Sequence, residues 1–293
     1  MTDWVSITDQ FERVDEYEID DHLFELYSER SPPDNLGFVN RSSNTITITL
    51  PQSNLDLTIK QSLSELSSSK ESSSTGFICW QSSVYFVDWL LSQKECPFAK
   101  IFQSKNDRVI VELGAGVAGI CASLLSSNVS RYIATDQKHI LKLLKENIES
   151  NISTSKYKSS TLDAPPVSRS GGGGSNSIAS IPIVDVLEFD WEDIDQGLYN
   201  YNQLIQGNKK PDILIACDTI YNEYLIPHFL NGLRSLLNKN SIALVVLQLR
   251  DSITLETFVK EIVIQQKLKL YSIPLQMLSH SLQSGFVIYC ITL

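Results

Sequence analysis

The chain has 293 residues, of which 42% are hydrophobic and 20% charged, a composition typical of a water-soluble protein with one large or two smaller domains. No stretch approaches the roughly 18 continuous apolar residues of a membrane span, and the acidic start has neither a signal nor a transit peptide pattern, so we expect a cytoplasmic location, with the nucleus as the alternative. The net charge of −10 favours a basic partner over nucleic acid, although solubility alone also explains it.

The cysteines and histidines lack the spacing of a disulfide framework or a metal site. Five cysteines are scattered without a C-x-x-C pair, and four histidines form no ligand pattern. We therefore expect reduced thiols and no metal.

The first 76 residues predict an N-terminal extension. Residues 1–30 contain ten acidic residues against two arginines, interleaved with apolar positions, and this predicts a peripheral helix or ordered arm. In "NTITITLPQSNLDLTIK" from residue 44, apolar residues alternate on both sides of a turn-forming Pro51–Asn54, as in a β-hairpin. A Ser-rich linker, residues 62–75, follows, and we expect it to be mobile.

Residues 77–293 predict an α/β domain with a flexible insertion at about 153–180. The insertion contains four consecutive glycines and cannot bury enough apolar surface to fold alone. Around it, short apolar strands alternate with amphipathic helices, a pattern that predicts a parallel sheet covered on both faces. The strand-like runs are "RVIVEL" (108), "RYIATD" (131), "IPIVDVLEF" (181), "PDILIACD" (211) and "IALVVLQLR" (242). The helix-like runs begin at residues 82, 119, 138, 224 and 255. "LKLYSIPL" (268) and "SGFVIYCITL" (284), with no helix between them, predict an antiparallel edge.

The stretch "VIVELGAGVAGI" raises the question of a nucleotide cofactor. Gly114, Gly116 and Gly119 fit G-x-G-x-x-G between a strand and a helix. Asp136 lies 22 residues past Gly114, at the tip of the next strand, where a carboxylate can accept bonds from a ribose. A turn that needs glycine only for its backbone geometry is the alternative.

Glu112 favours a particular kind of cofactor. A dinucleotide would place its pyrophosphate at this loop, where a neighbouring carboxylate repels it. S-adenosylmethionine (SAM) has no phosphate and carries an ammonium and a sulfonium, so an acid at the strand tip suits it, although Glu112 could instead cap a turn or face solvent. Asp190 and Trp191, after the third strand, could contact the adenine amine and ring, with a core tryptophan as the alternative.

Together, "ELGAG", "TD", "FDWED" and "CDTIYNEYL" resemble the seven-stranded class I SAM-dependent methyltransferases and, more narrowly, the family 16 protein-lysine methyltransferases. The resemblance covers residues 77–293 apart from the insertion. It implies a Rossmann-like seven-stranded sheet, mostly parallel with an antiparallel edge strand, beside the small N-terminal hairpin. It also implies a cofactor pocket, and the residues that would line it are Trp80, Gly114, Ala115, Gly116, Asp136, Trp191 and Cys217. Cys217 would contribute backbone contacts.

The mark of the family is D-x-x-Y, here Asp218 to Tyr221. We expect Asp218 to position the substrate amine, and Asn222 could share that role. Tyr221 would shape the channel that admits the substrate side chain. The alternative is that the motif only ends a strand and caps a helix. The Ser-rich insertions and "DTIYNEYLIP" resemble the fungal ribosomal lysine methyltransferases, which implies a basic ribosomal protein of the large subunit as substrate and a monomeric enzyme. Another protein target, a non-catalytic binding module and a dehydrogenase remain open.

Overall fold

The computed structural model describes residues 4–33, 35–52, 54–66, 75–92, 96–102, 105–152, 183–205 and 209–293. The predicted insertion at 153–180 and most of the Ser-rich linker lie outside the described residues. Within the described part of the chain, no helix is both long and apolar enough to cross a membrane.

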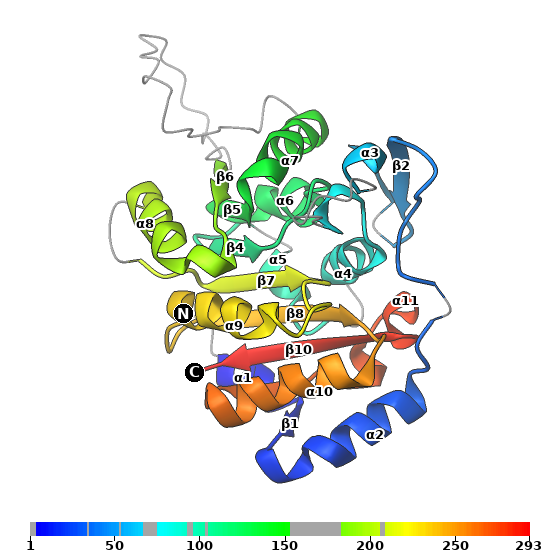
Figure 1. Ribbon diagram of the computed structural model, residues 1–293, viewed down its shortest axis with the longest axis vertical. Coiled ribbons are helices and arrows are strands. Elements are labelled where there is room, and N and C mark those ends of the chain that lie inside the picture. Colours follow the sequence, from blue (N-terminus) through cyan, green and yellow to red (C-terminus); the bar gives the residue numbers. More distant parts are fainter. Residues whose placement is uncertain are drawn as a thin grey trace.

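An eight-stranded sheet forms the centre of the molecule, in the order β1-β9-β10-β8-β7-β4-β5-β6 (Figure 1). The five strands from β8 to β6 run parallel, and β10 is antiparallel to both of its neighbours. The strands are β1 (Glu12–Val14), β4 (Val109–Leu113), β5 (Arg131–Asp136), β6 (Ile183–Glu188), β7 (Ile213–Cys217), β8 (Ile242–Gln248), β9 (Lys269–Ser272) and β10 (Phe286–Thr292). All five residues of β4 are buried, which explains its continuous apolar run.

Helices cover both faces of the sheet, so that two hydrophobic cores form. One core contains residues of α4, α6 and α7 together with the hairpin, and the other contains residues of α2, α8, α9 and α10. The helices are α1 (Trp4–Thr8), α2 (Ile19–Glu29), α3 (Leu63–Leu66), α4 (Gln81–Leu91), α5 (Ala99–Phe102), α6 (Ile120–Leu125), α7 (Lys138–Asn151), α8 (Ile194–Ile205), α9 (Leu225–Leu236), α10 (Ser252–Lys260) and α11 (His280–Gln283). Alternate residues of the strands enter opposite cores, as the period of two requires.

The predicted hairpin is confirmed as β2 (Thr45–Leu50) and β3 (Leu55–Lys60), which pair in register. It packs against α7, where the Asn147 side chain bonds the backbone N–H and the carbonyl of Lys60. Ile46, Leu50 and Ile59 are buried in the same core as α4 and α6. The N-terminal extension therefore shares its core with the sheet.

Five elements differ from the sequence-based expectation. The acidic arm contributes β1, an eighth strand that pairs antiparallel with β9 at the edge of the sheet. Helix α8 was not predicted because Gly197 and two asparagines interrupt its apolar pattern. The short helices α3, α5 and α11 were also not expected: α3 lies in the segment predicted as a mobile linker, and α11 lies between β9 and β10.

The direction of winding changes between β4 and β7. From β4 the chain proceeds to β5 and β6 on one side, whereas β7 and β8 lie on the other. In parallel α/β sheets, ligands bind at such a switch point, beyond the carboxyl ends of the strands.

Candidate active site

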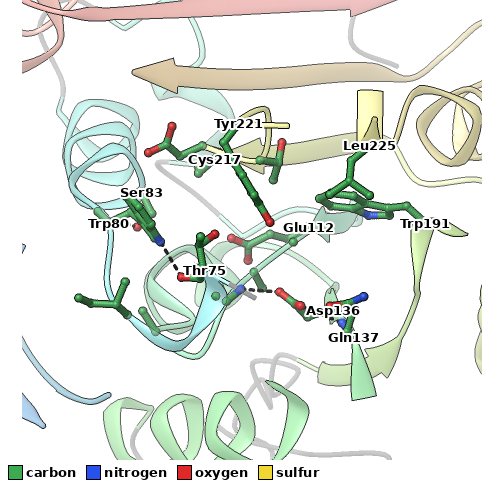
Figure 2. A pocket seen from close by; sticks show the side chains of 18 of the residues that line it. Thr75, Trp80, Ser83, Glu112, Asp136, Gln137, Trp191, Cys217, Tyr221 and Leu225 are labelled. Atoms are coloured by element: carbon green, nitrogen blue, oxygen red, sulfur yellow. Dashed lines mark hydrogen bonds between the residues drawn. The ribbon is translucent and has the colours of Figure 1, made fainter. Parts of the chain in front are cut away.

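A cavity of about 820 Å³ lies at this switch point, and eleven of the site residues predicted from the sequence line it, whereas Asn222 does not. The predicted residues are Trp80, Glu112, Gly114, Ala115, Gly116, Asp136, Asp190, Trp191, Cys217, Asp218 and Tyr221. The structure adds Thr75, Gly76, Ile78, Ser83, Ala118, Gln137, Phe189, Thr219 and Leu225. Thr75 and Trp80 lie on one side of the pocket and Trp191 and Leu225 on the other, with Tyr221 pointing into the space between them (Figure 2).

The glycine loop after β4 forms one wall of this pocket. Gly114 has φ +73°, and a Cβ atom there would lie 2.8 Å from the Thr219 methyl and 3.0 Å from the Trp191 ring. The amides of Gly114 and Ala115 both donate to the Thr135 carbonyl. Glycine is therefore favoured at position 114 by the backbone conformation and by the lack of room for a side chain beside Thr219 and Trp191.

Glu112 places a buried carboxyl group at the end of β4. It is 2% exposed, and its Oε2 accepts a hydrogen bond of 2.8 Å from the Tyr132 hydroxyl. Burial raises the pKa of Glu112 to about 7, although the hydrogen bonds from Tyr132 and Cys121 oppose the shift. A cation in the pocket would favour the ionised form, so the site is suited to a positively charged ligand.

Asp136 and Asp190 form a second polar wall, linked through Gln137. Asp136 accepts backbone bonds of 2.8 Å from Gly116 and from Gln137, and burial still raises its pKa to about 6. The Gln137 side chain donates to one oxygen of Asp190, and the other oxygen accepts from the Glu192 amide. Both carboxylates thus fix the pocket wall while they line it, and their contacts with ribose and adenine stay a prediction.

Two tryptophans close opposite sides of the pocket. Trp191 packs edge-on against Phe229 at a centroid distance of 5.1 Å. Trp80 begins α4, and its indole nitrogen donates to the Thr75 carbonyl at 3.1 Å (Figure 2). Trp191 also lies against Gly114, so a flat ring that enters this pocket would contact the face or the edge of the Trp191 ring.

Asp218 has a cationic partner within the chain. It has φ +58°, and its side chain is 2% exposed. Both carboxylate oxygens accept bonds of 2.6 Å from the Arg250 guanidinium, a bidentate ion pair. The sequence analysis did not anticipate this partner, and a direct contact of Asp218 with the substrate amine stays a prediction.

Arg250 connects Asp218 to two other parts of the chain. It also donates to the Leu36 carbonyl at 3.0 Å and to the Gln248 side chain at 2.9 Å. Its guanidinium carbon lies 5.2 Å from the centre of the Trp80 ring, in cation–π geometry. The Arg250 side chain thereby holds together three segments: the D-x-x-Y motif, the start of α4 and the segment before the hairpin.

Tyr221 and its neighbours complete the wall at the end of β7. The Tyr221 side chain forms a hydrogen bond with Thr75 on the opposite side, and burial raises its pKa. Asn222, the other candidate for the amine, does not line the cavity, and its side-chain oxygen accepts from the Tyr224 amide. The Cys217 sulfur lies 4.0 Å from that of Cys121, and burial raises the pKa of Cys217, so both thiols stay protonated and Cys217 contributes shape.

Comparison with known proteins identifies the family. The lysine methyltransferase family model matches residues 54–164. The ribosomal lysine N-methyltransferase 5 of Lachancea thermotolerans is 32% identical over 91% of this chain and 95% of its own length. The proteins of the same name from Vanderwaltozyma polyspora and Saccharomyces cerevisiae are 30% and 28% identical, each over 95% of this chain and 98% of their own length.

The chain belongs to the lysine methyltransferase family. Its methyl donor is SAM, and the pocket of this methyltransferase fits that molecule. The pocket offers the Glu112 carboxyl group to a cationic ligand, and the hydroxyl of Thr219 is buried without a hydrogen-bond partner among the described residues. SAM would be held by the two tryptophans and by Glu112, Asp136 and Asp190. When bound, it supplies a methyl group that its positively charged sulfur activates. Among the described residues, no group of three metal-ligating side chains could hold a metal ion.

Four residues show why parts of the site were not predicted from the sequence. Thr75 and Gly76 fall at the end of a Ser-rich segment, where no pattern distinguishes them. Gln137 directly follows Asp136 and could have been inferred from that position. Arg250 follows β8 at "LQLR", and a charged residue after a buried strand is a signal that the strand-end rule could have used.

Proposed function

We propose that this methyltransferase transfers a methyl group from SAM to a lysine of a large-subunit ribosomal protein. The names of the matched relatives, which align over nearly their whole length, support this substrate. The single observation that carries the reaction is the position of Tyr221, which points from the end of β7 into the pocket that contains Glu112 (Figure 2). A second cavity shares Tyr221 and gives an acceptor a way to approach.

The reaction is an in-line displacement in which the lysine nitrogen forms a bond to the methyl carbon as the carbon–sulfur bond breaks. An unperturbed lysine has a pKa of about 10.4, so on the order of one amine in a thousand is neutral at neutral pH. The protein must therefore hold the amine in line with the methyl group and let solvent take the proton.

The residues of the β7 end have two roles in this proposal. Tyr221 is the channel wall that touches the substrate side chain. Asp218 is a positioning residue: paired with Arg250, it fixes the left-handed backbone turn from which Tyr221 projects. Tyr221 therefore contacts the substrate side chain, and the Asp218–Arg250 ion pair orients Tyr221.

A different protein target is the main alternative, and a dinucleotide-dependent dehydrogenase is another. The buried Glu112 disfavours the dehydrogenase, because a pyrophosphate beside its carboxylate would be repelled. A thermal shift with SAM and none with NAD would separate the two, since a ligand that binds only the native state raises its stability.

The direct test is transfer of radiolabelled methyl from SAM into fractionated ribosomal proteins and into whole cytosolic extract. We expect one labelled large-subunit protein, with the label on lysine after hydrolysis. Label on a different protein would keep the enzyme class and contradict the ribosomal substrate. Asp218→Ala should abolish the label while SAM still binds, and wild-type turnover in that variant would contradict the role of the ion pair.

A further inference from the structure

A groove between α2 and α10 leads from the surface to the methyl-transfer site. Its outer part, about 900 Å³ and open to solvent, is lined by Phe24, Tyr27, Pro32, Asp251 and Glu256 among others. Helices α2 and α10 lie side by side at the end of the molecule that is lowest in Figure 1. We call this feature the α2–α10 groove.

The groove and the cofactor pocket are connected by a cavity that shares lining residues with each. An inner cavity of about 470 Å³ shares Tyr27, Arg250 and Asp251 with the outer groove, and it shares Tyr221 with the cofactor pocket. Tyr221 thus stands between the place of the methyl donor and the inner end of the groove. A side chain that enters through the groove reaches the donor past Tyr221.

The ionised groups along the groove are predominantly acidic. Asp251 and Glu256 line it directly. Arg250 is paired with Asp218 and Glu256 with Lys260, so Asp251 is the lining carboxylate that has no ion-pair partner among the described residues. Bonds from Thr254 at the start of α10 lower the pKa of Asp251, so its carboxylate stays ionised.

Helix α2 adds negative charge on the outer side. Its four acidic residues, Asp20, Asp21, Glu25 and Glu29, are all exposed. Arg30, which follows the helix, is buried, and its guanidinium donates to the backbone carbonyls of Phe286 and Ile273. Burial lowers the pKa of His22 to about 4, so it stays neutral at physiological pH. The exposed charge of the helix is therefore mainly negative, with Lys260 near Asp20 as a partial counter-charge, and such a surface repels nucleic acid and attracts a basic polypeptide.

The groove also offers apolar and polar contacts suited to a peptide. Phe24, which lines the groove, is 75% exposed although it is a large apolar residue. The Tyr27 hydroxyl is buried and has no hydrogen-bond partner among the described residues. A peptide backbone in the groove would supply that partner, and the stems of basic side chains would cover the exposed apolar surface.

We propose that the α2–α10 groove binds the polypeptide segment around the target lysine, with basic residues beside that lysine facing Asp251, Glu256 and the acids of α2. This rests on the proposed function, since it assumes a protein lysine as the acceptor. The target lysine enters past Tyr221, and the flanking residues stay in the outer groove. Specificity for the substrate then comes from the N-terminal extension as well as from the methyltransferase domain.

The test compares a groove variant with a matched control. Asp251→Asn together with Glu256→Gln removes two charges and keeps an N-capping side chain at the start of α10. Glu146→Gln together with Glu149→Gln removes two exposed charges from α7, and Glu149 is paired with Lys145 four residues away, as Glu256 is with Lys260. Methyl transfer into RNA-free large-subunit ribosomal proteins is measured for each, together with SAM affinity and thermal unfolding.

We expect the groove variant to raise the KM for the protein substrate about tenfold, with a smaller change in kcat, because exposed charge pairs each contribute modestly. Added salt should weaken wild-type binding and reduce this difference. Tyr27→Phe should raise KM about threefold by removing one hydrogen bond. The α7 control should leave KM unchanged.

An unchanged KM in the groove variant would overturn the proposal, as would an equal rise in the α7 control, which would show a general effect of net charge. Methyl label on RNA instead of protein would also overturn it. If the wild-type chain labels no protein, the proposed function itself is refuted. This result is distinct from failure of the groove proposal, because it is seen without any variant.

Discussion

The donor half and the acceptor half of the active site are assembled in different ways. The donor half, from Glu112 to Trp191, lies at the ends of three strands that follow one another in the sequence and lie side by side in the sheet. The acceptor half joins Leu36, Trp80 and Asp218 through Arg250, and the bond from Arg250 to Leu36 spans 214 residues. The donor half is built from local motifs, and the acceptor half from long-range contacts.

This difference predicts how substitutions in each half should act. The donor half holds a small cofactor with residues of three neighbouring strand ends. The acceptor half depends on the N-terminal extension, whose residues pack on the sheet and against α10. Substitutions in the two halves should therefore separate SAM binding from methyl transfer.

The largest expected effect is on the donor half. Gly114→Val introduces a side chain where even a Cβ atom would lie 2.8 Å from Thr219 and 3.0 Å from Trp191, in a backbone conformation that favours glycine. We expect SAM binding, measured by calorimetry, to weaken by at least about 100-fold. Wild-type affinity with a folded protein would show that the cofactor does not use this loop.

The next effect concerns the acceptor half. Arg250→Ala leaves the buried Asp218 without its partner and releases the turn that carries Tyr221, so methyl transfer should fall about 50-fold while SAM affinity changes less than about threefold. Arg250→Lys keeps the charge but not the bidentate geometry and should recover only part of the activity. Full activity in the alanine variant would refute the positioning role.

The pH dependence of SAM binding tests the role of Glu112. Because the pKa of Glu112 is raised to about 7 by burial, the carboxyl group is mostly protonated below that pH, and a bound cation favours the ionised form. SAM affinity should therefore fall nearly tenfold between roughly pH 7.5 and pH 6, with a proton released on binding. Glu112→Gln should bind weakly and lack this dependence. A flat profile in the wild type would show that Glu112 does not respond to the ligand.

The smallest effect is expected at Tyr221. Tyr221→Phe keeps the ring that forms the channel wall and loses only the hydrogen bond with Thr75. We expect kcat to fall about threefold, with SAM affinity unchanged. Tyr221→Ala, which removes the wall, should cost far more, and equal rates for the two variants would contradict the role of the ring.

The sequence was sufficient for the features that depend on local patterns. The hairpin, the parallel strands and eleven of the twenty residues that line the pocket followed from apolar periodicity, from glycine spacing and from the family resemblance. The bond network of Asp218 did not follow, because nothing in "CDTIYNEYL" shows that Arg250 lies beside it. Strand β1 was missed for the same reason: its three residues become a strand only by pairing with β9.

The most direct measurement is a pair of assays on the same samples: SAM affinity and methyl transfer into ribosomal proteins, for wild type, Gly114→Val and Arg250→Ala. The account predicts that Gly114→Val loses both activities, whereas Arg250→Ala binds SAM like the wild type and transfers methyl about 50-fold more slowly. Parallel losses of binding and transfer in Arg250→Ala would contradict the division of the site into a donor half and an acceptor half.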